Sequence, residues 1–271
     1  MTFILSSLKG APLPELPEVE TLCRQLNKTV SGLTVQNMLT LDTAKLADFP
    51  DRIGRQIRNV KRQGKHIVLH FDDDQNMIVH LRMTGRFLWQ AREDESPKHV
   101  RMIMTFSSGR IVFIDPRRFM TVIKGDCPDR GSAMDPLTDM TPQGLAEQGK
   151  NCKRPIKTFL MDQSIIAGIG NIYACEILYH AGINPSRPVN TIPAEQWPEI
   201  VQMTRRILER AIACRGSSIS DWRDFYGNEG TFHHEHRVYG RKGLPCPLCQ
   251  SDILRITIGG RGSYFCPQCQ T

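Results

Sequence analysis

The sequence predicts an α+β protein of several domains: an N-terminal β-sandwich with an α-helix, a helical domain, and a C-terminal β-hairpin module held by cysteines. Three observations predict this order. Short apolar runs separated by turn residues fill the first half, helical periodicity follows in the second half, and four cysteines in two close pairs lie near the end. A chain of 271 residues is long enough to bury more than one core.

The β-sandwich is expected within residues 14–130. Turn signals such as Asp72-Asp73-Asp74 and Ser108-Gly109 separate apolar runs of strand length. These runs lie at residues 67–71, 77–81, 102–106 and 111–114. A helix is expected before them, because proline and acidic residues open a segment whose apolar residues recur at helical spacing up to Val30.

The second half is predicted to be helical over residues 143–234, after a linker at residues 131–142 that is rich in aspartate and proline. Helices are expected at residues 156–162, 170–181 and 194–214, and the last of these carries a long apolar stripe. A polar loop begins near Ser217. A small terminal module is expected at residues 235–271.

The charge distribution favours an anionic partner. Lysine and arginine total 35 against 28 acidic residues, a formal net charge of +7. Residues 52–71 hold six basic residues and no acidic one, and residues 237–271 hold five basic residues and one acidic residue. Two separated basic stretches suggest two parts that grip one polyanion, although solvated faces would show the same pattern. The composition excludes low-complexity disorder, and no apolar run is long enough to cross a bilayer, so we expect a cytoplasmic protein.

The C-terminal cysteines form a C-x2-C-x16-C-x2-C pattern, which is typical of a four-thiolate zinc site. The predicted ligands are Cys246, Cys249, Cys266 and Cys269. Four thiolates leave no open position on the metal, so a single structural zinc ion is expected. The spacer suits a hairpin with strands at residues 253–258 and 263–265 and a tip at residues 259–262 that carries Arg261. Disulfides and ordinary buried thiols are the alternatives.

Further motifs carry a family resemblance from Pro14 to Gln270. In chain order they are Pro14-Glu-Leu-Pro-Glu-Val-Glu20, Lys61-Arg-Gln-Gly-Lys65, His80-Leu-Arg-Met-Thr-Gly85, Asp115-Pro-Arg-Arg-Phe119, Gly168-Ile-Gly-Asn-Ile-Tyr173 and Val238-Tyr-Gly-Arg241. With the cysteine module, they resemble the formamidopyrimidine-DNA glycosylases, bacterial enzymes that excise 8-oxoguanine and ring-opened purines. The resemblance implies that the helical domain is a helix-two-turns-helix domain and that damaged double-stranded DNA binds in the cleft between the domains.

The resemblance also implies the chemistry. An N-terminal proline, here Pro14, attacks C1′ of the damaged nucleotide and forms a Schiff base, after which β,δ-elimination cleaves the abasic site. A free secondary amine is partly neutral and nucleophilic near pH 7, as this step requires. Glu15 is expected to protonate the sugar or base, and Glu18 to support the site. Lys65 and Arg261 are expected to hold phosphates.

Other residues are expected to contact DNA by the same resemblance. Asn171 would bind a phosphate, and the weaker candidates are His80, Lys157 and Tyr239. The residues expected to fill the space left by the flipped nucleotide are Met83, Arg117 and Phe119. The loop of residues 217–232 corresponds to the one that covers the flipped purine.

Several of these residues also have a structural interpretation. Glu15 and Glu18 suit the first turn of a helix. Met83 and Phe119 suit a core, and Asn171 suits a helix cap. Three histidines, His233, His234 and His236, resemble a metal cluster, but we expect ordinary loop residues because the cysteines already account for a metal.

Residues 1–13 precede the segment that carries the resemblance, and an amide nitrogen at Pro14 could not form a Schiff base. Leu13 stands where the family has its initiator methionine, and leucine codons include alternative start codons. Lys9-Gly10 must be encoded by a purine-rich run that is similar to a ribosome-binding site. We therefore interpret residues 1–13 as a misassigned start, with leader cleavage and a genuine extension as the alternatives.

Two other functions remain open at this stage. The related endonuclease VIII branch acts on oxidised pyrimidines with the same fold and proline chemistry. A non-catalytic protein that binds damaged DNA would follow if residues 1–13 are retained. The sequence gives no sign of an oligomer, so a monomer is expected.

Overall fold

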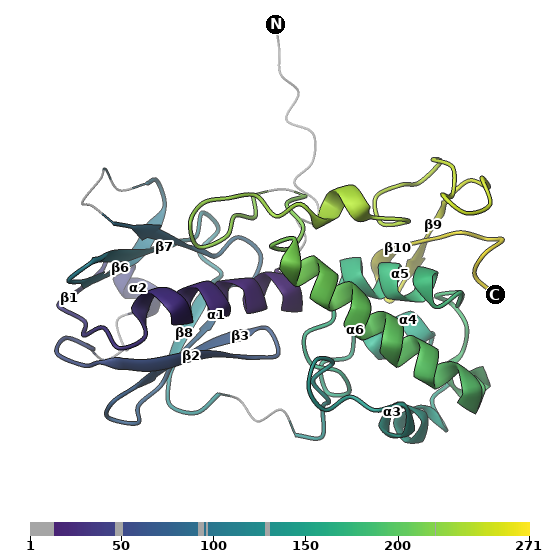
Figure 1. The fold of residues 1–271 in the computed structure, drawn as a ribbon, viewed down its shortest axis with the longest axis horizontal. Helices are drawn as coiled ribbons and strands as arrows, with labels where there is room; N and C mark the ends of the chain where they lie inside the picture. Colours follow the sequence, from purple (N-terminus) through teal and green to yellow (C-terminus); the bar gives the residue numbers. More distant parts are fainter. Residues whose placement is uncertain (1–13, 47–50, 92–94, 96, 128–130, 220) are drawn as a thin grey trace, which may run out of the picture.

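The computed structural model describes residues 14–46, 51–91, 95, 97–127, 131–219 and 221–271 (Figure 1). The expected extension at residues 1–13 lies outside the described residues. The chain forms two lobes, a β-rich lobe from the first half and a helical lobe from the second half, with a small hairpin module on the helical lobe. This arrangement confirms the predicted α+β class.

The β-rich lobe is a sandwich of two four-stranded antiparallel sheets. One sheet has the order β1 (Asn37–Thr40), β6 (Val100–Phe106), β7 (Gly109–Ile114) and β5 (Arg86–Gln90). The other has the order β2 (Ile57–Gln63), β3 (His66–Phe71), β4 (Met77–His80) and β8 (Thr121–Lys124). A single helical turn, α2 (Thr43–Leu46), follows β1. The four expected strands correspond to β3, β4, β6 and β7.

Helix α1 (Leu16–Val30) belongs to both lobes. It begins directly after Glu15, with Pro17 in its first turn, where a missing N–H costs nothing. Val19, Leu22 and Leu26 are buried in the core of the sandwich, whereas Leu16 is buried in the core of the helical lobe. The N-terminal end of α1 therefore lies at the junction of the two lobes (Figure 1).

The helical lobe contains α3 (Pro142–Gly149), α4 (Ile156–Leu160), α5 (Asn171–His180) and α6 (Trp197–Ala213). Three short 3-10 helices, Val189–Thr191, Ala194–Gln196 and Phe232–Glu235, complete it. Two successive turns join α4 to α5, in agreement with the expected helix-two-turns-helix arrangement. Trp197 and Phe159 pack against each other in its core, with ring centroids 6.0 Å apart.

A buried ion network ties the two lobes together. The Arg62 guanidinium contacts Glu20 Oε2 at 2.8 Å and Asp135 Oδ2 at 2.8 Å. Glu20 lies on α1, Arg62 lies on β2, and Asp135 lies in the expected linker. Because the Arg62 side chain is only 5% exposed, water screens these attractions weakly.

The hairpin module consists of β9 (Leu254–Ile258) and β10 (Arg261–Phe265). Arg261 pairs with Ile258, so the turn contains only Gly259 and Gly260, both with positive φ. Glycines with positive φ suit a two-residue hairpin turn. The expected four-residue tip was therefore too long. Arg261 is the first residue of β10, so its backbone is held by the pairing with Ile258. Among the described residues, no helix is long and apolar enough to span a membrane.

Candidate active site

The centre of the candidate site is the buried carboxylate of Glu15, next to the buried Pro14 at the start of α1. Glu15 Oε1 accepts a hydrogen bond of 3.0 Å from the Ile172 amide, and Oε2 accepts one of 3.4 Å from the Tyr173 amide. These amides belong to the first turn of α5, where the helix dipole also favours a negative charge. Burial raises the pKa of Glu15, while Lys65 and the amides oppose that shift.

Gly170 is required by this geometry. A Cβ atom at residue 170 would lie 2.3 Å from Cδ of Glu15, which no real side chain tolerates. The glycine-rich segment before α5 therefore lets the helix terminus approach the carboxylate closely. The same segment supplies the Ile169 carbonyl, which accepts a 3.1 Å hydrogen bond from Lys65 Nζ.

Glu18 lies behind Glu15 and is equally buried. Its carboxylate accepts hydrogen bonds from the Tyr173 hydroxyl at 2.6 Å, the Ser217 amide at 2.8 Å and the Glu15 amide at 2.9 Å. Burial and, to a smaller extent, the neighbouring Glu15 charge raise the pKa of Glu18, while the Tyr173 hydrogen bond opposes them, and the net pKa is about 7. A group with that pKa can hold or release a proton near neutral pH.

Sequence reasoning did not find the partners of Glu18. Tyr173 and Ser217 are 155 and 199 residues away along the chain, so no local pattern joins them to α1. Gly216 has a φ of +82°, and a Cβ there would lie 2.6 Å from Glu18 Oε1. Gly216, directly before Ser217, was the one sequence signal that could have pointed to a close approach of the backbone at this position.

A cationic pocket of about 340 Å³ opens beside Glu15. Lys65, His80 and Arg261, three of the predicted residues, line it together with Arg82. Burial and the Arg261 charge lower the pKa of Lys65, and Glu15 opposes that shift. Burial lowers the pKa of His80 to about 3, so its imidazole is neutral and accepts a 2.9 Å hydrogen bond from the Arg82 amide at Nδ1. The sequence analysis did not single out Arg82, although it lies within the motif His80-Leu-Arg-Met-Thr-Gly85.

Asn171 connects the helical lobe to the hairpin module. Lys157 Nζ donates a 2.5 Å hydrogen bond to Asn171 Oδ1, and Asn171 Nδ2 donates a 3.1 Å bond to the Gly262 carbonyl. Tyr239 also interacts with Asn171 through its side chain. Lys157 is fully buried, so the structure places it behind Asn171, away from solvent.

Met83, Arg117 and Phe119 lie on two turns at one end of the sandwich. Buried Asp115 joins these turns: its carboxylate accepts hydrogen bonds from the Thr84 hydroxyl and from the Arg117 amide. The Arg117 guanidinium lies over the Phe119 ring, 5.0 Å from its centroid. Phe119 is 43% exposed, so the alternative that it is a core residue is wrong.

The four predicted cysteine ligands converge in the hairpin module. Their sulfur atoms all lie within 4.8 Å of one another, and the Cys246–Cys269 and Cys249–Cys266 pairs are 3.8 and 3.3 Å apart. Sulfurs at the corners of a tetrahedral zinc site lie about 3.8 Å apart, whereas disulfide sulfurs lie about 2 Å apart. The cluster therefore fits one structural zinc ion and excludes the disulfide alternative. In the described part of the chain, no other group of three or more potential ligands, the histidines included, comes together in this way.

Family models match three segments of the chain. The formamidopyrimidine-DNA glycosylase N-terminal domain matches residues 13–122, and the H2TH domain of the same enzymes matches residues 133–223. The zinc finger found in FPG and IleRS matches residues 243–271. These matches follow the sandwich, the helical lobe and the hairpin module in order.

Curated relatives and solved structures agree with these matches. The formamidopyrimidine-DNA glycosylase of Chloroflexus aurantiacus is 40% identical, over 95% of this chain and 98% of the relative. That of Desulfitobacterium hafniense is 35% identical, over 95% of this chain and all of the relative. A Lactococcus lactis Fpg structure with DNA that contains an abasic site has a TM-score of 0.87 and 31% identity, over 95% of this chain and 99% of that chain. A Lactococcus lactis Fpg mutant with Fapy-dG-containing DNA also has a TM-score of 0.87.

A β-sandwich, a helix-two-turns-helix lobe and a four-cysteine hairpin around buried carboxylates define a class of DNA repair glycosylase. Within that class, this chain belongs to the formamidopyrimidine-DNA glycosylase family.

Proposed function

We propose that this protein removes oxidised purines, namely 8-oxoguanine and formamidopyrimidines, from double-stranded DNA and then cleaves the abasic site. The observation that carries the proposal is the Glu15 carboxylate, buried beside Pro14 and held by the amides of α5. This arrangement places an acid with a raised pKa beside the family's nucleophile position. The named relatives and the DNA in the Lactococcus lactis structures support the same reaction.

In the proposed reaction the Pro14 nitrogen bonds to C1′ of the damaged nucleotide. The bond from C1′ to the base breaks, and the base leaves with a proton. The sugar ring opens as its oxygen takes a proton from Glu15, and the amine loses its own proton to give a charged iminium. Loss of a C2′ proton then expels the 3′ phosphate, and a second elimination expels the 5′ phosphate.

Pro14 must carry a free amine for this reaction. An amide nitrogen holds its lone pair in resonance and cannot attack C1′. We therefore propose that the active protein begins at Pro14. Glu18 supports the site because its carboxylate accepts the Glu15 amide and so holds the backbone of Glu15 in place.

The DNA-binding surface in this proposal has two parts. Lys65, Arg261, Asn171 and His80 face the phosphates beside the flipped nucleotide. Lys157 and Tyr239 support Asn171. The residues that enter the vacated space in the duplex are Met83, Arg117 and Phe119. Residues 14–130 carry the nucleophile, residues 143–234 and 235–271 carry the opposite side of the DNA cleft, and residues 131–142 connect them.

A single chain supplies every residue of this proposed site, which supports action as a monomer. The substrate is chromosomal DNA, so the proposed location is the cytoplasm at the nucleoid. Zinc would be held by the four cysteines and would keep the hairpin that carries Arg261 in place. Four thiolate ligands leave the metal no open position for substrate.

The test is borohydride trapping on a duplex with 8-oxoguanine opposite cytosine, with protein that begins at Pro14 and with all 271 residues. We expect a covalent adduct only from the shorter protein, and none from the same protein after its N-terminal amine has been acetylated. Tight binding without an adduct from either form would support a non-catalytic protein that binds damaged DNA. Preferred trapping on an oxidised pyrimidine would support the endonuclease VIII alternative.

A further inference from the structure

The loop of residues 217–232 starts at the candidate active site, where the Ser217 amide binds Glu18. The two ends of the loop are joined: the Ser218 amide donates to the Gly230 carbonyl at 3.3 Å, and the Gly230 amide donates to Ser218 Oγ at 2.9 Å. Residue 220 lies outside the described residues. The loop is therefore a closed unit with its base on the helical lobe.

One face of α1 holds this loop along its length. Glu18, Gln25 and Thr29 lie seven and four residues apart, a spacing that places them on the same side of a helix. Glu18 binds the Ser217 amide, and Thr29 Oγ1 lies 2.8 Å from the Tyr226 hydroxyl. Gln25, between them, binds the middle of the loop.

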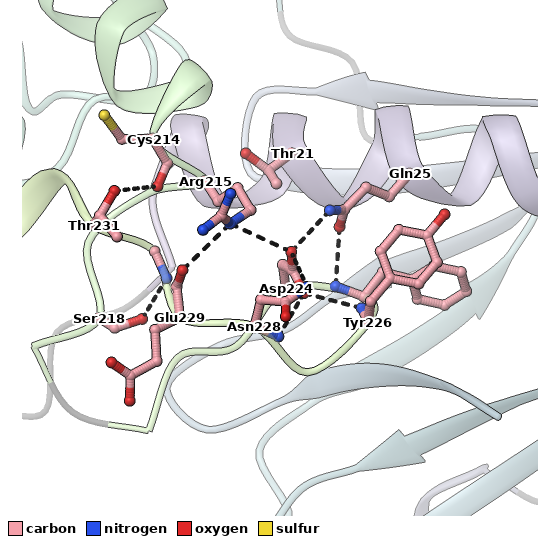
Figure 2. Close-up of polar contacts among 12 residues, drawn as sticks. Thr21, Gln25, Cys214, Arg215, Ser218, Asp224, Tyr226, Asn228, Glu229 and Thr231 are labelled. Carbon is pink, nitrogen blue, oxygen red and sulfur yellow. Dashed lines mark hydrogen bonds and ion pairs between the residues drawn. The ribbon is translucent and has the colours of Figure 1, made fainter.

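Asp224 anchors the loop through the hydrogen bonds that its buried carboxylate accepts (Figure 2). Its side chain is fully buried, and Oδ2 accepts a 2.9 Å hydrogen bond from Gln25 Nε2. Its other oxygen accepts bonds from the amides of Tyr226 at 3.0 Å and Asn228 at 2.8 Å. Arg215 Nε lies 3.7 Å from Oδ2. A buried carboxylate with this many donors is costly to move away from them.

Gln25 uses both ends of its amide. While Nε2 donates to Asp224, Oε1 accepts a 3.0 Å hydrogen bond from the Phe225 amide. The Phe225 carbonyl in turn accepts a 2.8 Å bond from the Trp89 amide, and the Phe225 ring is buried in the core of the sandwich. The loop therefore joins the helical lobe to the sandwich at a point about two turns along α1 from Glu18.

The start of the loop lies close to Glu15, because both contact the Glu18 carboxylate. Lys65 lines the cationic pocket, while Glu18 accepts hydrogen bonds from both the Glu15 amide and the Ser217 amide at the start of the loop. In the proposed function C1′ bonds to Pro14 and the phosphates occupy the cationic pocket, and we take the base to lie away from that pocket, where the loop begins at Ser217. An abasic sugar has no group that reaches this side.

We propose that Gln25 and Asp224 are positioning residues that hold the loop in place for base removal and are not needed for cleavage of an existing abasic site. This inference rests on the proposed function. Neither residue touches the sugar or phosphates in this arrangement, so both act through the position of the loop. Loss of either residue should therefore lower the rate of base removal relative to the rate of abasic-site cleavage.

The Gln25→Glu variant tests the pair. It replaces the donor that faces Asp224 with a second carboxylate oxygen, while the bond from the Phe225 amide is kept. Two buried carboxylates at this distance repel each other, so the loop should leave its position. We expect single-turnover excision of 8-oxoguanine to fall by about tenfold or more, since the loss of a buried charge-assisted hydrogen bond has this size, while cleavage of a preformed abasic site changes by less than about twofold.

The double variant Gln25→Glu with Asp224→Asn provides the rescue. The asparagine amide can donate to the introduced carboxylate, and the Phe225 amide keeps its acceptor, so the donors and acceptors match again. Asp224→Asn alone leaves two amide donors facing each other and should resemble the Gln25→Glu variant. We expect the double variant to recover excision to within about threefold of the unchanged protein.

The matched control is Gln202→Glu, the same chemical change at an exposed position of α6. It should alter neither activity. Equal loss of both activities in Gln25→Glu, no loss of excision, or no recovery in the double variant would each overturn the proposal. Absence of both activities from unchanged protein that begins at Pro14 would instead refute the proposed function, so the two failures are distinguishable.

Discussion

The Thr84 hydroxyl donates a hydrogen bond to the buried carboxylate of Asp115. This contact joins the turn that carries Met83 to the turn that carries Arg117 and Phe119. The residues proposed to enter the duplex are thus held relative to each other by a carboxylate that does not itself face solvent.

The Thr84→Val variant tests this connection. It keeps the shape of the side chain and removes the donor, which costs about 1 to 3 kcal/mol for a bond to a charged group. We expect a lower melting temperature and weaker binding to a lesion duplex. Discrimination between opposite bases should also decline, measured as the ratio of excision rates opposite cytosine and adenine. Unchanged discrimination would show that the two turns act independently.

Glu18 predicts a pH dependence of stability. Burial raises its pKa from 4.5 to about 7, so the folded protein keeps a proton that the unfolded chain has released. The contribution of this group is therefore full below pH 4.5 and is lost as the pH rises towards 7, a change of about 3 kcal/mol.

Urea denaturation across this pH range would measure the effect. We expect the free energy of unfolding of the unchanged protein to fall with pH relative to that of the Glu18→Gln variant. A difference between the two proteins that is constant with pH would contradict the assigned titration.

Zinc removal should uncouple the hairpin from the rest of the protein. A Cys269→Ser variant loses one thiolate of the proposed metal site, so the hairpin should lose its order and Arg261 its fixed position. We expect loss of bound zinc and a decrease in DNA affinity of about tenfold or more. Cys152→Ser, a cysteine outside the cluster, is the control and should keep both metal and affinity.

The salt dependence of DNA binding should separate Arg261 from Lys157. Arg261 is exposed and lines the cationic pocket, so Arg261→Ala should reduce the slope of log affinity against log salt by about 0.9. Lys157 is fully buried and binds Asn171, so Lys157→Met should lower affinity by about threefold to tenfold without changing the slope. A reduced slope for Lys157→Met would show that its ammonium group contacts a phosphate.

The buried ion network should contribute strongly to stability once one partner is removed. Asp135→Ala leaves the Arg62 guanidinium with fewer partners at a site where its side chain is 5% exposed, at a cost of about 3 kcal/mol. The control is Asp74→Asn, because the Arg58–Asp74 pair is largely exposed and should contribute less than about 1 kcal/mol, and asparagine tolerates the positive φ at this position. Chemical denaturation of both variants, each compared with the unchanged protein, would measure the two losses.

The sequence predicted elements with strong local patterns. The cysteine spacing identified the metal site, and the apolar strands β3, β4, β6 and β7 stood out from their turns. Strand β2 was missed because its sequence is IRNVKRQ, in which charged side chains on the solvent face conceal the two buried residues Ile57 and Val60. Its partners in the sheet decide its conformation, and they are not visible in a local window.

The candidate site was predictable in its residue types but not in its connections. The family resemblance indicated Pro14, Glu15, Lys65 and Arg261. It did not show that the Glu18 carboxylate binds Tyr173 and Ser217, since these contacts depend on how the two lobes pack. The length of the hairpin turn was also misjudged, because only the register shows that Arg261 pairs with Ile258.

Helix α1 contributes Leu16 to one hydrophobic core and Val19, Leu22 and Leu26 to the other. The proposed nucleophile precedes Leu16 by two positions, so it lies at the junction of the two lobes and next to residues that are packed into both. Any rotation of one lobe against the other as DNA enters must therefore displace or twist the end of this helix. The position of the proposed nucleophile therefore depends on how both lobes are arranged.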